Sequence, residues 1–369
     1  MIKVEPPEGD STRRTGPAKE ENMAASFIGS NRSKRSVVLD LKWPEAQQAL
    51  LGLVDGADVF MHNIRPQKLA RIGIAPEVIS ARNPRIVYAA LTGFMEGGPY
   101  SGMPAYDDII QGMSGLADLV DRYSGEMRYT PAATADKTCG MTVAQAILAA
   151  LIARERTGKG SYVEIPMFES MVSYNLVEHF QGLHFDPPLS GAGYVRVLDP
   201  SRKPYRTTDG FICMMPYTDE NWRLFFSEVG QPQLVADLRF AGIANRTRNI
   251  GELLATAAQF IARHSTDYWV QACARLQIPA APVTRLDDLT QDEHLVATGY
   301  FQDIEDPAMG TVHFPGVPVK FDGQRPSIAM PPRLGEHTRA VLIEAGVSLD
   351  TIDSLIASGA ARQHGGLTS

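Results

Sequence analysis

The sequence predicts an α/β protein built on a parallel sheet, and two observations carry this prediction. Short runs rich in β-branched and aromatic residues, at residues 35–42, 57–63 and 84–94, alternate with stretches of helical periodicity. Such alternation is typical of βαβ units in a doubly wound sheet. The chain of 369 residues is 44% apolar, which is enough to bury a large core in two domains or one elaborate one.

The first hundred residues supply most of the predicted strands. The chain opens with the strand-like run "MIKVE" and the turn "PPEGD". We expect strands at "RSVVLDLK", "ADVFMHN" and "PRIVYAALTGF", and helices at "PEAQQALLGLV" and "PQKLARIGI". Ligands of doubly wound sheets bind at the carboxyl ends of the strands, so "HNIRP" and "LTGFMEGGPY" are candidate ligand-binding loops.

The next elements lead to an acidic residue at a strand-to-helix junction. The Ala- and Leu-rich run "TVAQAILAALIARER" predicts a helix, "TGKG" a turn, and "SYVEIP" a strand that runs into a second helix. Glu169 lies at the start of that second helix. The free backbone N–H groups there favour a negatively charged side chain by about 0.3–1 kcal/mol.

The rest of the chain predicts a second, smaller domain and a returning tail. Local helices and loops over residues 205–306 indicate a smaller α+β domain. Residues 307–324 are extended and Pro-rich, which suggests a linker. We expect residues 325–369 to return and complete the large, Rossmann-like domain of residues 1–195.

Composition and charge argue against several classes of protein. The net charge of −7 comes without a basic stripe, which argues against nucleic-acid binding. Three isolated cysteines indicate neither a disulfide framework nor a zinc site, so we expect no metal. No apolar run reaches the ~20 residues of a membrane helix, and the N-terminus lacks the apolar core of a signal peptide. We therefore expect a cytoplasmic protein with no membrane partner.

Each candidate residue has a structural reading beside its functional one. Glu169 is either an ordinary first-turn acid or a carboxylate nucleophile. Asp107 and Asp108 are either helix caps or catalytic acids. Lys68 and Arg71, with their neighbour Arg65, form either an exposed charged face or a phosphate-binding patch at a strand end. The P-loop, dinucleotide-binding and hydrolase-elbow motifs do not occur.

Seven segments, in order, resemble the class III coenzyme A transferases. This CaiB/BaiF family includes formyl-CoA, carnitine and bile-acid CoA-transferases and is related to the α-methylacyl-CoA racemases. The resemblance covers nearly the whole chain. Its segments are "IKVEPPEGDSTR", "NRSKRSVVLDLK", "ADVFMHNIRPQKLARIGI", "NPRIVYAALTGFMEGGPYSGMPAYDDIIQGMSGL", "DKTCGMTVAQAILAALIARERTGKGSYVEIPMFESM", "IPAAPV" and "LGEHTRAVL".

The resemblance gives Glu169 a specific role. In that family the matching residue is typically aspartate, which attacks the thioester of an acyl-CoA and passes through an acyl anhydride to an enzyme-bound CoA thioester. Glu169 would do the same through a glutamyl-CoA intermediate and hand CoA to a small carboxylic acid. Its extra methylene moves the carboxylate by about an ångström, which matters where attack geometry matters.

The resemblance also implies contacts to coenzyme A and to the reacting groups. Those to CoA come from residues at the ends of two strands: Leu39, Lys42, Asn63, Ile64, Lys68 and Arg71. Tyr106 and Asp107 match active-site positions. The racemases have a proton-shuttling histidine near the position of Tyr106, so tyrosine counts against racemisation. Two lysines of the formyl-CoA enzyme correspond to Thr92 and Pro104 in this chain.

Two further expectations concern architecture. The family implies a ring-like monomer that interlocks with a second copy as a homodimer. It also implies a strand, a CoA-contacting loop and a helix before the "IKVE" run. Either the start of the chain is assigned too late, or the protein lacks this unit, which would expose a sheet edge and remove part of the CoA site.

Three functions follow, of which CoA transfer between an acyl-CoA and a carboxylic acid is the first. An isomerase acting on 2-methylacyl-CoA, with Glu169 as one base, is the second. The third is an acyl-CoA binding protein without catalysis.

Overall fold

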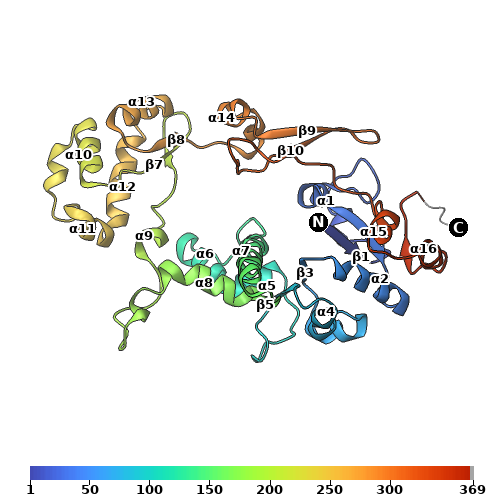
Figure 1. The fold of residues 1–369 in the computed structure, drawn as a ribbon. Coiled ribbons are helices and arrows are strands. Elements are labelled where there is room, and N and C mark those ends of the chain that lie inside the picture. The colour runs from blue at the N-terminus through green and yellow to red at the C-terminus, as the bar shows by residue number, and fades with distance from the viewer. Residues whose placement is uncertain (366–369) are drawn as a thin grey trace. The chain divides into compact units, whose positions relative to one another are not determined.

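The computed structural model describes residues 1–365 and divides the chain into two compact units (Figure 1). We call them unit 1 and unit 2. Unit 1 contains residues 1–104, 139–167 and 289–365, and unit 2 contains residues 105–138 and 168–288. Each unit is therefore assembled from segments that are distant in the sequence.

Unit 1 is built around parallel strands, as predicted. Its first sheet pairs β1 (Ile2–Glu5) with β2 (Arg35–Leu39) in parallel, and β11 (Ala361–Arg362) is antiparallel to β2. Its second sheet is parallel throughout and contains β3 (Val59–His62), β4 (Val87–Thr92) and β5 (Ser161–Pro166).

The predicted parallel strands form two separate sheets. Within residues 1–365 no ladder of hydrogen bonds joins the two sheets. The outer strands β1 and β3 instead contribute Ile2, Lys3, Phe60 and His62 to the lining of a cavity of about 480 Å³. The two strand edges are therefore separated by space and not paired.

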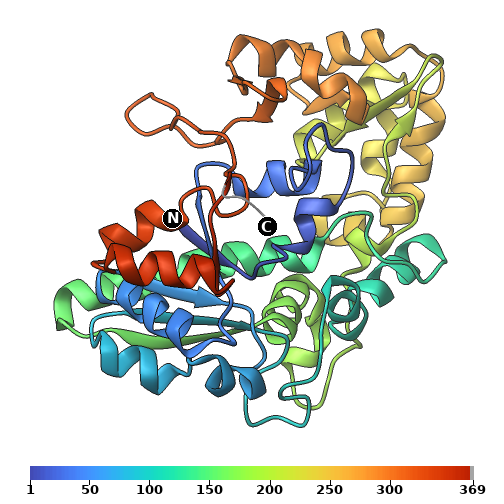
Figure 2. The same cartoon turned by 90° about the vertical axis from the view of Figure 1, so that its right-hand side faces the viewer.

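Helices cover both faces of the strands in unit 1. They are α1 (Ala25–Asn31), α2 (Pro44–Asp55), α3 (Pro66–Leu69), α4 (Pro76–Arg82), α7 (Thr134–Thr157, from Cys139 onward), α14 (Glu293–Ala297), α15 (Thr338–Glu344) and α16 (Leu349–Ala357). Figure 2 shows α15 and α16, in red, beside the blue strands, and α15 contacts β2. The C-terminal helices thus pack against the first strands of the chain.

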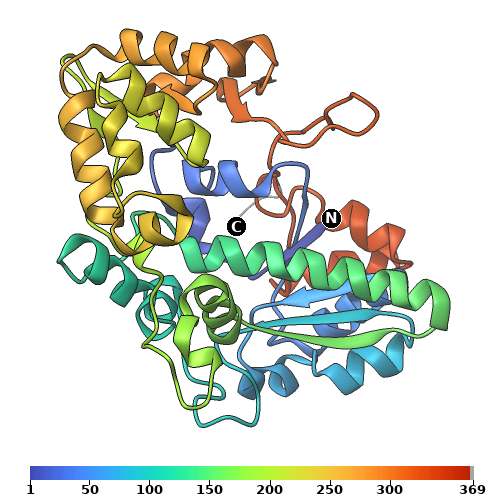
Figure 3. The same ribbon diagram turned by 90° about the vertical axis from the view of Figure 1, so that its left-hand side faces the viewer.

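Side chains of β4 alternate between two cores, as a strand buried on both faces requires. Tyr88 and Ala90 face the main core, which α2, α4, α15 and α16 complete. Ala89 faces the other way and packs with Ile165 of β5 and Val143 of α7. Figure 3 shows α7, in green, running along this side of β5.

A hairpin and an ion-pair cluster complete unit 1. Strands β9 (Phe301–Asp306) and β10 (Gly310–Pro315) pair in an antiparallel hairpin. Arg333 donates to Asp306 at 2.7 Å and to Glu20 at 2.6 Å. This cluster connects the end of the hairpin with both terminal regions of the chain.

Unit 2 has its own core around a small antiparallel sheet. The strands are β6 (Tyr205–Arg206), β7 (Phe211–Met214) and β8 (Ala280–Pro282). The helices are α5 (Asp107–Met113), α6 (Leu116–Ser124), α8 (Met167–His179, from Phe168 onward), α9 (Val195–Leu198), α10 (Asp219–Glu228), α11 (Gly242–Arg248), α12 (Ile250–Ile261) and α13 (Thr266–Leu276). An aromatic cluster of Trp222, Phe225, Phe226 and Trp269 forms the centre of this core.

Candidate functional site

Glu169 lies in the first turn of α8, immediately after β5. Strand β5 ends at Pro166, α8 begins at Met167, and Glu169 is the third residue of the helix. Its side chain is half-buried. The first N–H groups of a helix have no partner within the helix, so an anionic side chain at this position is favoured electrostatically. This is the placement that the sequence predicts.

The opposite face of α8 holds the helix in unit 2. Met171, Asn175 and His179, at four-residue spacing, are all buried. The amide of Asn175 donates to the carbonyl oxygen of Ser114 at 2.9 Å, and Nδ1 of His179 accepts the backbone N–H of Tyr194 at 3.1 Å. These contacts fix the rotation of α8, and helical periodicity places Glu169 about 200° from Met171 around the axis.

Asp107 begins α5 and ties it to the start of α7. Its Oδ1 accepts the backbone N–H of Asp136 at 2.9 Å, and its Oδ2 accepts from the side chain of Gln111. Gln111 is fully buried, and its Oε1 accepts both the N–H and the hydroxyl of Thr130 at 2.9 Å. The carboxylate of Asp107 therefore orders the loop before α7.

The environment of Asp107 also affects a neighbouring acid. Burial, and then the negative charge of Asp107, raise the pKa of the Asp136 carboxyl group above its ordinary value. The charge of Asp107 thus disfavours the ionised form of Asp136, where α5 meets the start of α7.

Tyr106 and Asp108 are open to solvent on either side of Asp107. Tyr106 is the N-cap residue of α5 in an extended conformation, and its side chain is 80% exposed. Asp108 is also exposed in the first turn. Tyr106, Asp107 and Glu169, the predicted catalytic residues, all belong to unit 2.

The predicted CoA-binding residues all belong to unit 1, at the carboxyl ends of β2 and β3. Asn63 and Ile64 directly follow β3, and Lys42 lies three residues after β2. Lys68 is in α3, and Arg71 is in the 3₁₀ turn of Ala70–Ile72 that follows it.

Gln47 of α2 brings the segments after β2 and β3 together, which the sequence did not reveal. Its side-chain amide donates to the carbonyl oxygen of Leu41 at 2.8 Å and to that of Arg71 at 3.4 Å. The cations Lys42, Lys68 and Arg71 are exposed, and among residues 1–365 none of them forms an ion pair with a carboxylate. They are therefore available to an anionic ligand such as a phosphate group.

Leu39 differs from the other five residues because its side chain is part of the core. It is 1% exposed and packs in the main cluster of unit 1. Its backbone pairs with Ala361 of β11. Any contact of Leu39 with a ligand would therefore come from its backbone at the end of β2.

His62, the last residue of β3, is a buried group that sequence reasoning missed. Its Nδ1 accepts the N–H of Ile64 at 3.0 Å, while its Nε2 is buried without a partner in the described chain. Burial lowers the pKa of His62 to about 4, so the ring is neutral at pH 7. It lines the 480 Å³ cavity together with Asn63 and Ile64.

Neither a metal-binding cluster nor a membrane-spanning helix is present in the described part of the chain. Within residues 1–365 no group of three or more His, Cys, Asp or Glu side chains has the geometry of a metal site. No helix in this part of the chain is both long and apolar enough to cross a membrane.

Comparison with known proteins gives consistent matches along the chain. The family model described as CoA-transferase family III matches residues 1–338. A succinate–glutarate CoA-transferase of Agrobacterium fabrum is 32% identical over 374 residues, covering 96% of this chain and 89% of that protein. A formyl-CoA:oxalate CoA-transferase of Escherichia coli is 27% identical over 382 residues, covering 96% and 91%.

A solved structure matches the fold as well. The crystal structure of a CAIB/BAIF family protein from Brucella suis superposes with a TM-score of 0.76 at 29% identity, covering 93% of this chain and 91% of that one.

Proposed function

Because this chain belongs to CoA-transferase family III, an enzyme class that transfers CoA between an acyl-CoA and an acid, we propose that Glu169 is the nucleophile of that transfer. The observation that carries the proposal is the place of Glu169 in the first turn of α8, directly after β5. A carboxylate at this position is favoured as an anion, which is the form that attacks a thioester.

The proposed reaction has four steps that conserve the thioester energy. The Glu169 carboxylate attacks the thioester carbonyl of the donor, and CoA thiolate leaves to give a mixed anhydride. The thiolate then attacks the glutamyl carbonyl, which releases the donor acid and leaves a glutamyl-CoA thioester. The acceptor carboxylate displaces the thiolate to form a second anhydride. Attack of the thiolate on the acceptor carbonyl gives the new acyl-CoA and restores the Glu169 carboxylate.

The other residues of the proposal bind and position. Lys42, Lys68 and Arg71 would hold the phosphate groups of CoA as unpaired cations, and Asn63 and Ile64 would contact it at the end of β3. Asp107 would act as a positioning residue, since both of its oxygens already accept hydrogen bonds that order the loop before α7. Tyr106 has an exposed side chain that can reach a substrate.

The relatives suggest which acids to try first. The two enzymes compared above are named for succinate and glutarate and for formyl-CoA and oxalate. We therefore propose short carboxylic acids as donor and acceptor, with succinyl-CoA and glutarate as the first pair. The ring-like, interlocked homodimer implied by the family is part of the same proposal.

Trapping the covalent intermediate tests the proposal. The protein is incubated with succinyl-, formyl-, acetyl-, butyrobetainyl- or 2-methylacyl-CoA and then with hydroxylamine, and modified peptides are mapped by mass spectrometry. A hydroxamate on Glu169 is expected with the true donor, because hydroxylamine cleaves both anhydrides and thioesters.

Two variants control the trapping experiment. Glu169→Gln should give no hydroxamate, and Glu178→Gln, which changes an exposed carboxylate on the same helix, should leave the yield unchanged. CoA exchange between donor and acceptor without any modification of Glu169 would refute the assigned nucleophile. Exchange of the α-proton without CoA exchange would refute the transfer reaction itself.

A further inference from the structure

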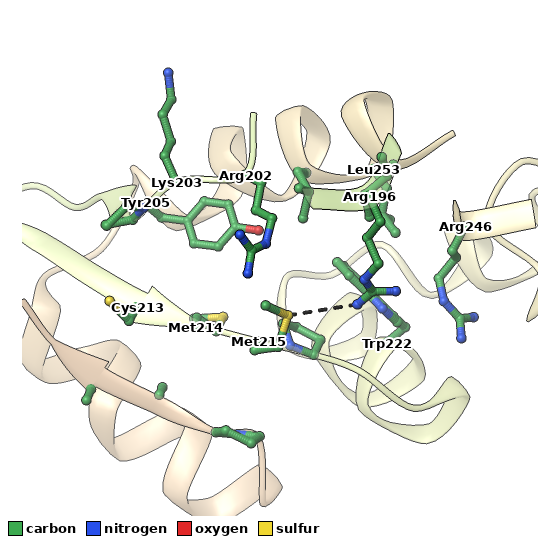
Figure 4. Close-up of a pocket in the computed structure, with 17 residues that line it drawn as sticks. Arg196, Arg202, Lys203, Tyr205, Cys213, Met214, Met215, Trp222, Arg246 and Leu253 are labelled. Atoms are coloured by element: carbon green, nitrogen blue, oxygen red, sulfur yellow. Dashed lines mark hydrogen bonds between the residues drawn. The ribbon is translucent and has the colours of Figure 1, made fainter. Parts of the chain in front are cut away.

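Unit 2 contains a second cavity, of about 660 Å³, that the residues assigned to catalysis do not line (Figure 4). Its size lies within the range of about 300–1,000 Å³ that is usual for small-molecule sites. Its lining combines the end of β7, β8, α9, α12 and the segment before β6. All of these elements belong to unit 2.

One side of the cavity is apolar. Met214, Trp222, Leu253 and Leu254 line it, and each of these side chains is at most 7% exposed. Ile250 continues the same surface. Burial of a hydrocarbon against such a surface is favourable by about 25 cal/mol per Å² of apolar area removed from water.

The same cavity carries four cations and no acidic residue in its lining: Arg196, Arg202, Lys203 and Arg246. In the part of the chain that the structure describes, Arg196, Arg202 and Lys203 form no ion pair with a carboxylate. Figure 4 shows the guanidinium group of Arg202 beside the ring of Tyr205. In a protein of net charge −7, this local excess of positive charge requires an explanation.

Arg246 is the buried member of these four cations. Its side chain is 4% exposed, and two of its nitrogens are satisfied by the carbonyl oxygen of Phe240 and by Asp219. Its third nitrogen, Nε, is buried and has no hydrogen-bond partner among residues 1–365. A buried donor without an acceptor costs about 1–3 kcal/mol, which an anionic ligand that reached Nε would recover.

We propose that this cavity binds an organic carboxylate with a hydrocarbon body, such as a medium-chain fatty acid. The carboxylate would accept hydrogen bonds from the arginine side chains, and the hydrocarbon would lie against Met214, Trp222 and Leu254. Neither an inorganic anion nor a neutral hydrocarbon would use both halves of the lining. This inference does not rest on the proposed function of Glu169.

Cys213 gives a direct readout because it lines the cavity. It is exposed, whereas the other two cysteines, Cys139 and Cys273, are buried and serve as internal references. The full-length protein, without any CoA ester, is treated with N-ethylmaleimide in the presence of hexanoate, octanoate or decanoate. The rate of Cys213 alkylation is followed by mass spectrometry, and affinity by calorimetry.

Decanoate is expected to slow alkylation of Cys213, and each added methylene should tighten binding by up to about fourfold. Acetate and decanol, which lack the chain or the charge, should bind at least tenfold more weakly than decanoate. Arg202→Gln should weaken decanoate about tenfold or more, since it removes a charged donor. Arg206→Gln, an exposed arginine on β6 outside the cavity, is the matched control and should have no effect.

Three results would overturn the proposal. They are equal binding of decanol and decanoate, decanoate binding that leaves Cys213 unprotected, and Cys213 protection that depends on protein concentration instead of ligand. The last result would mean that a second copy of the chain fills the cavity. Repeating the titration on Glu169→Gln separates this site from the proposed chemistry, because decanoate binding should not change there even if transfer is lost.

Discussion

At the scale of single residues, Glu169 carries the chemical proposal, and its length is the feature to vary. Glu169→Gln removes the nucleophile and is expected to lower kcat by at least about 10³-fold. Glu169→Asp keeps the charge but retracts the carboxylate by about an ångström, which is expected to cost about 10- to 100-fold in kcat. Steady-state assays with the trapped donor measure both effects.

The same assays must show that binding is intact. KM for the acyl-CoA should stay within about threefold in both variants, because neither substitution removes the contacts of Asn175 and His179 that hold α8. Full activity of Glu169→Gln would contradict the role assigned to this residue.

A second residue-scale prediction concerns the buried pair of Arg13 and Glu5. Arg13 donates to Glu5 at 2.7 and 2.8 Å, and the two side chains are 0% and 2% exposed. Burial opposes the charge on Glu5, but hydrogen bonds from Arg13 and Ser36 outweigh it and lower its pKa. Arg13→Met leaves that carboxylate without its counterion and is expected to lower the free energy of unfolding by about 3–5 kcal/mol in urea titrations.

The matched control is an exposed pair in the same unit. Arg35→Met breaks the bridge to Glu344, whose side chains are 38% and 57% exposed, and should cost no more than about 1 kcal/mol. Replacing Glu5 by Leu in the Arg13→Met background should recover most of the loss. Equal losses in the Arg13 and Arg35 variants would rule out a special role for burial.

At the scale of elements, the cations after β3 are predicted to bind the phosphate groups of CoA. Lys68→Gln combined with Arg71→Gln should raise KM for the acyl-CoA about tenfold or more while kcat changes little, since the contacts are remote from the reacting carbonyl. The effect should shrink as ionic strength rises, because exposed charges are screened.

Lys159→Gln is the comparison for this prediction. Lys159 is exposed and lies before β5, at the amino end of the parallel strands, so its replacement should leave KM unchanged. If both sets of variants raised KM alike, the general charge of the protein and not a phosphate site would explain the effect.

The ion-pair cluster of Arg333, Asp306 and Glu20 predicts that the stability of the protein depends on pH. Hydrogen bonds from Arg333 lower the pKa of Asp306 to about 2, against about 3.9 in an unfolded chain. Because folding lowers the pKa of Asp306, its carboxylate stabilises the fold at pH values above its pKa in the unfolded chain. This stabilisation is lost as pH falls from about 4 to about 2. Arg333→Met should therefore cost about 1–2 kcal/mol at pH 7, allowing for solvent screening, and much less at pH 2.

Chemical denaturation at both pH values measures this difference. Arg339→Met, which breaks an exposed pair with Asp353, should show a small loss that does not depend on pH. A loss for Arg333→Met that is equally large at pH 2 would exclude the Asp306 carboxylate as its cause.

The elements differ in how far the sequence predicts them. Strands β1 to β5 and the junction at Glu169 were predicted because two-residue alternation and turn residues such as Gly158, at φ +74°, are local signals. The helix expected over "PQKLARIGI" is shorter, since α3 gives way at Ala70 to a 3₁₀ turn that ends at Gly73 in the left-handed region. The bridging role of Gln47 and the cluster of Arg196, Arg202 and Arg246 depend on contacts between distant segments, which no local pattern encodes.

At the scale of the whole molecule, an apolar row on α7 predicts self-association. Met141, Leu148 and Ile152 lie on one face of this helix and are 59–62% exposed. We expect a homodimer of about 81 kDa, twice the chain mass of 40.3 kDa, by light scattering after size-exclusion chromatography. Leu148→Glu with Ile152→Glu should shift the mass toward the monomer, whereas Arg156→Glu, one turn beyond Ile152 at the end of the helix and outside the row, should not. A wild-type mass near 40 kDa would contradict the dimer.

The arrangement of unit 1 has a consequence for how the protein is made. Leu39 of β2 pairs with Ala361, roughly 320 residues further along the chain. At a synthesis rate of about 5–20 residues per second, the nascent β2 strand waits about 16–64 s for that partner. During this time the apolar surface that α15 and α16 will cover is exposed on the ribosome, while the later strands and helices of unit 2 are still being added. We therefore expect this protein to be prone to aggregate while it is being translated.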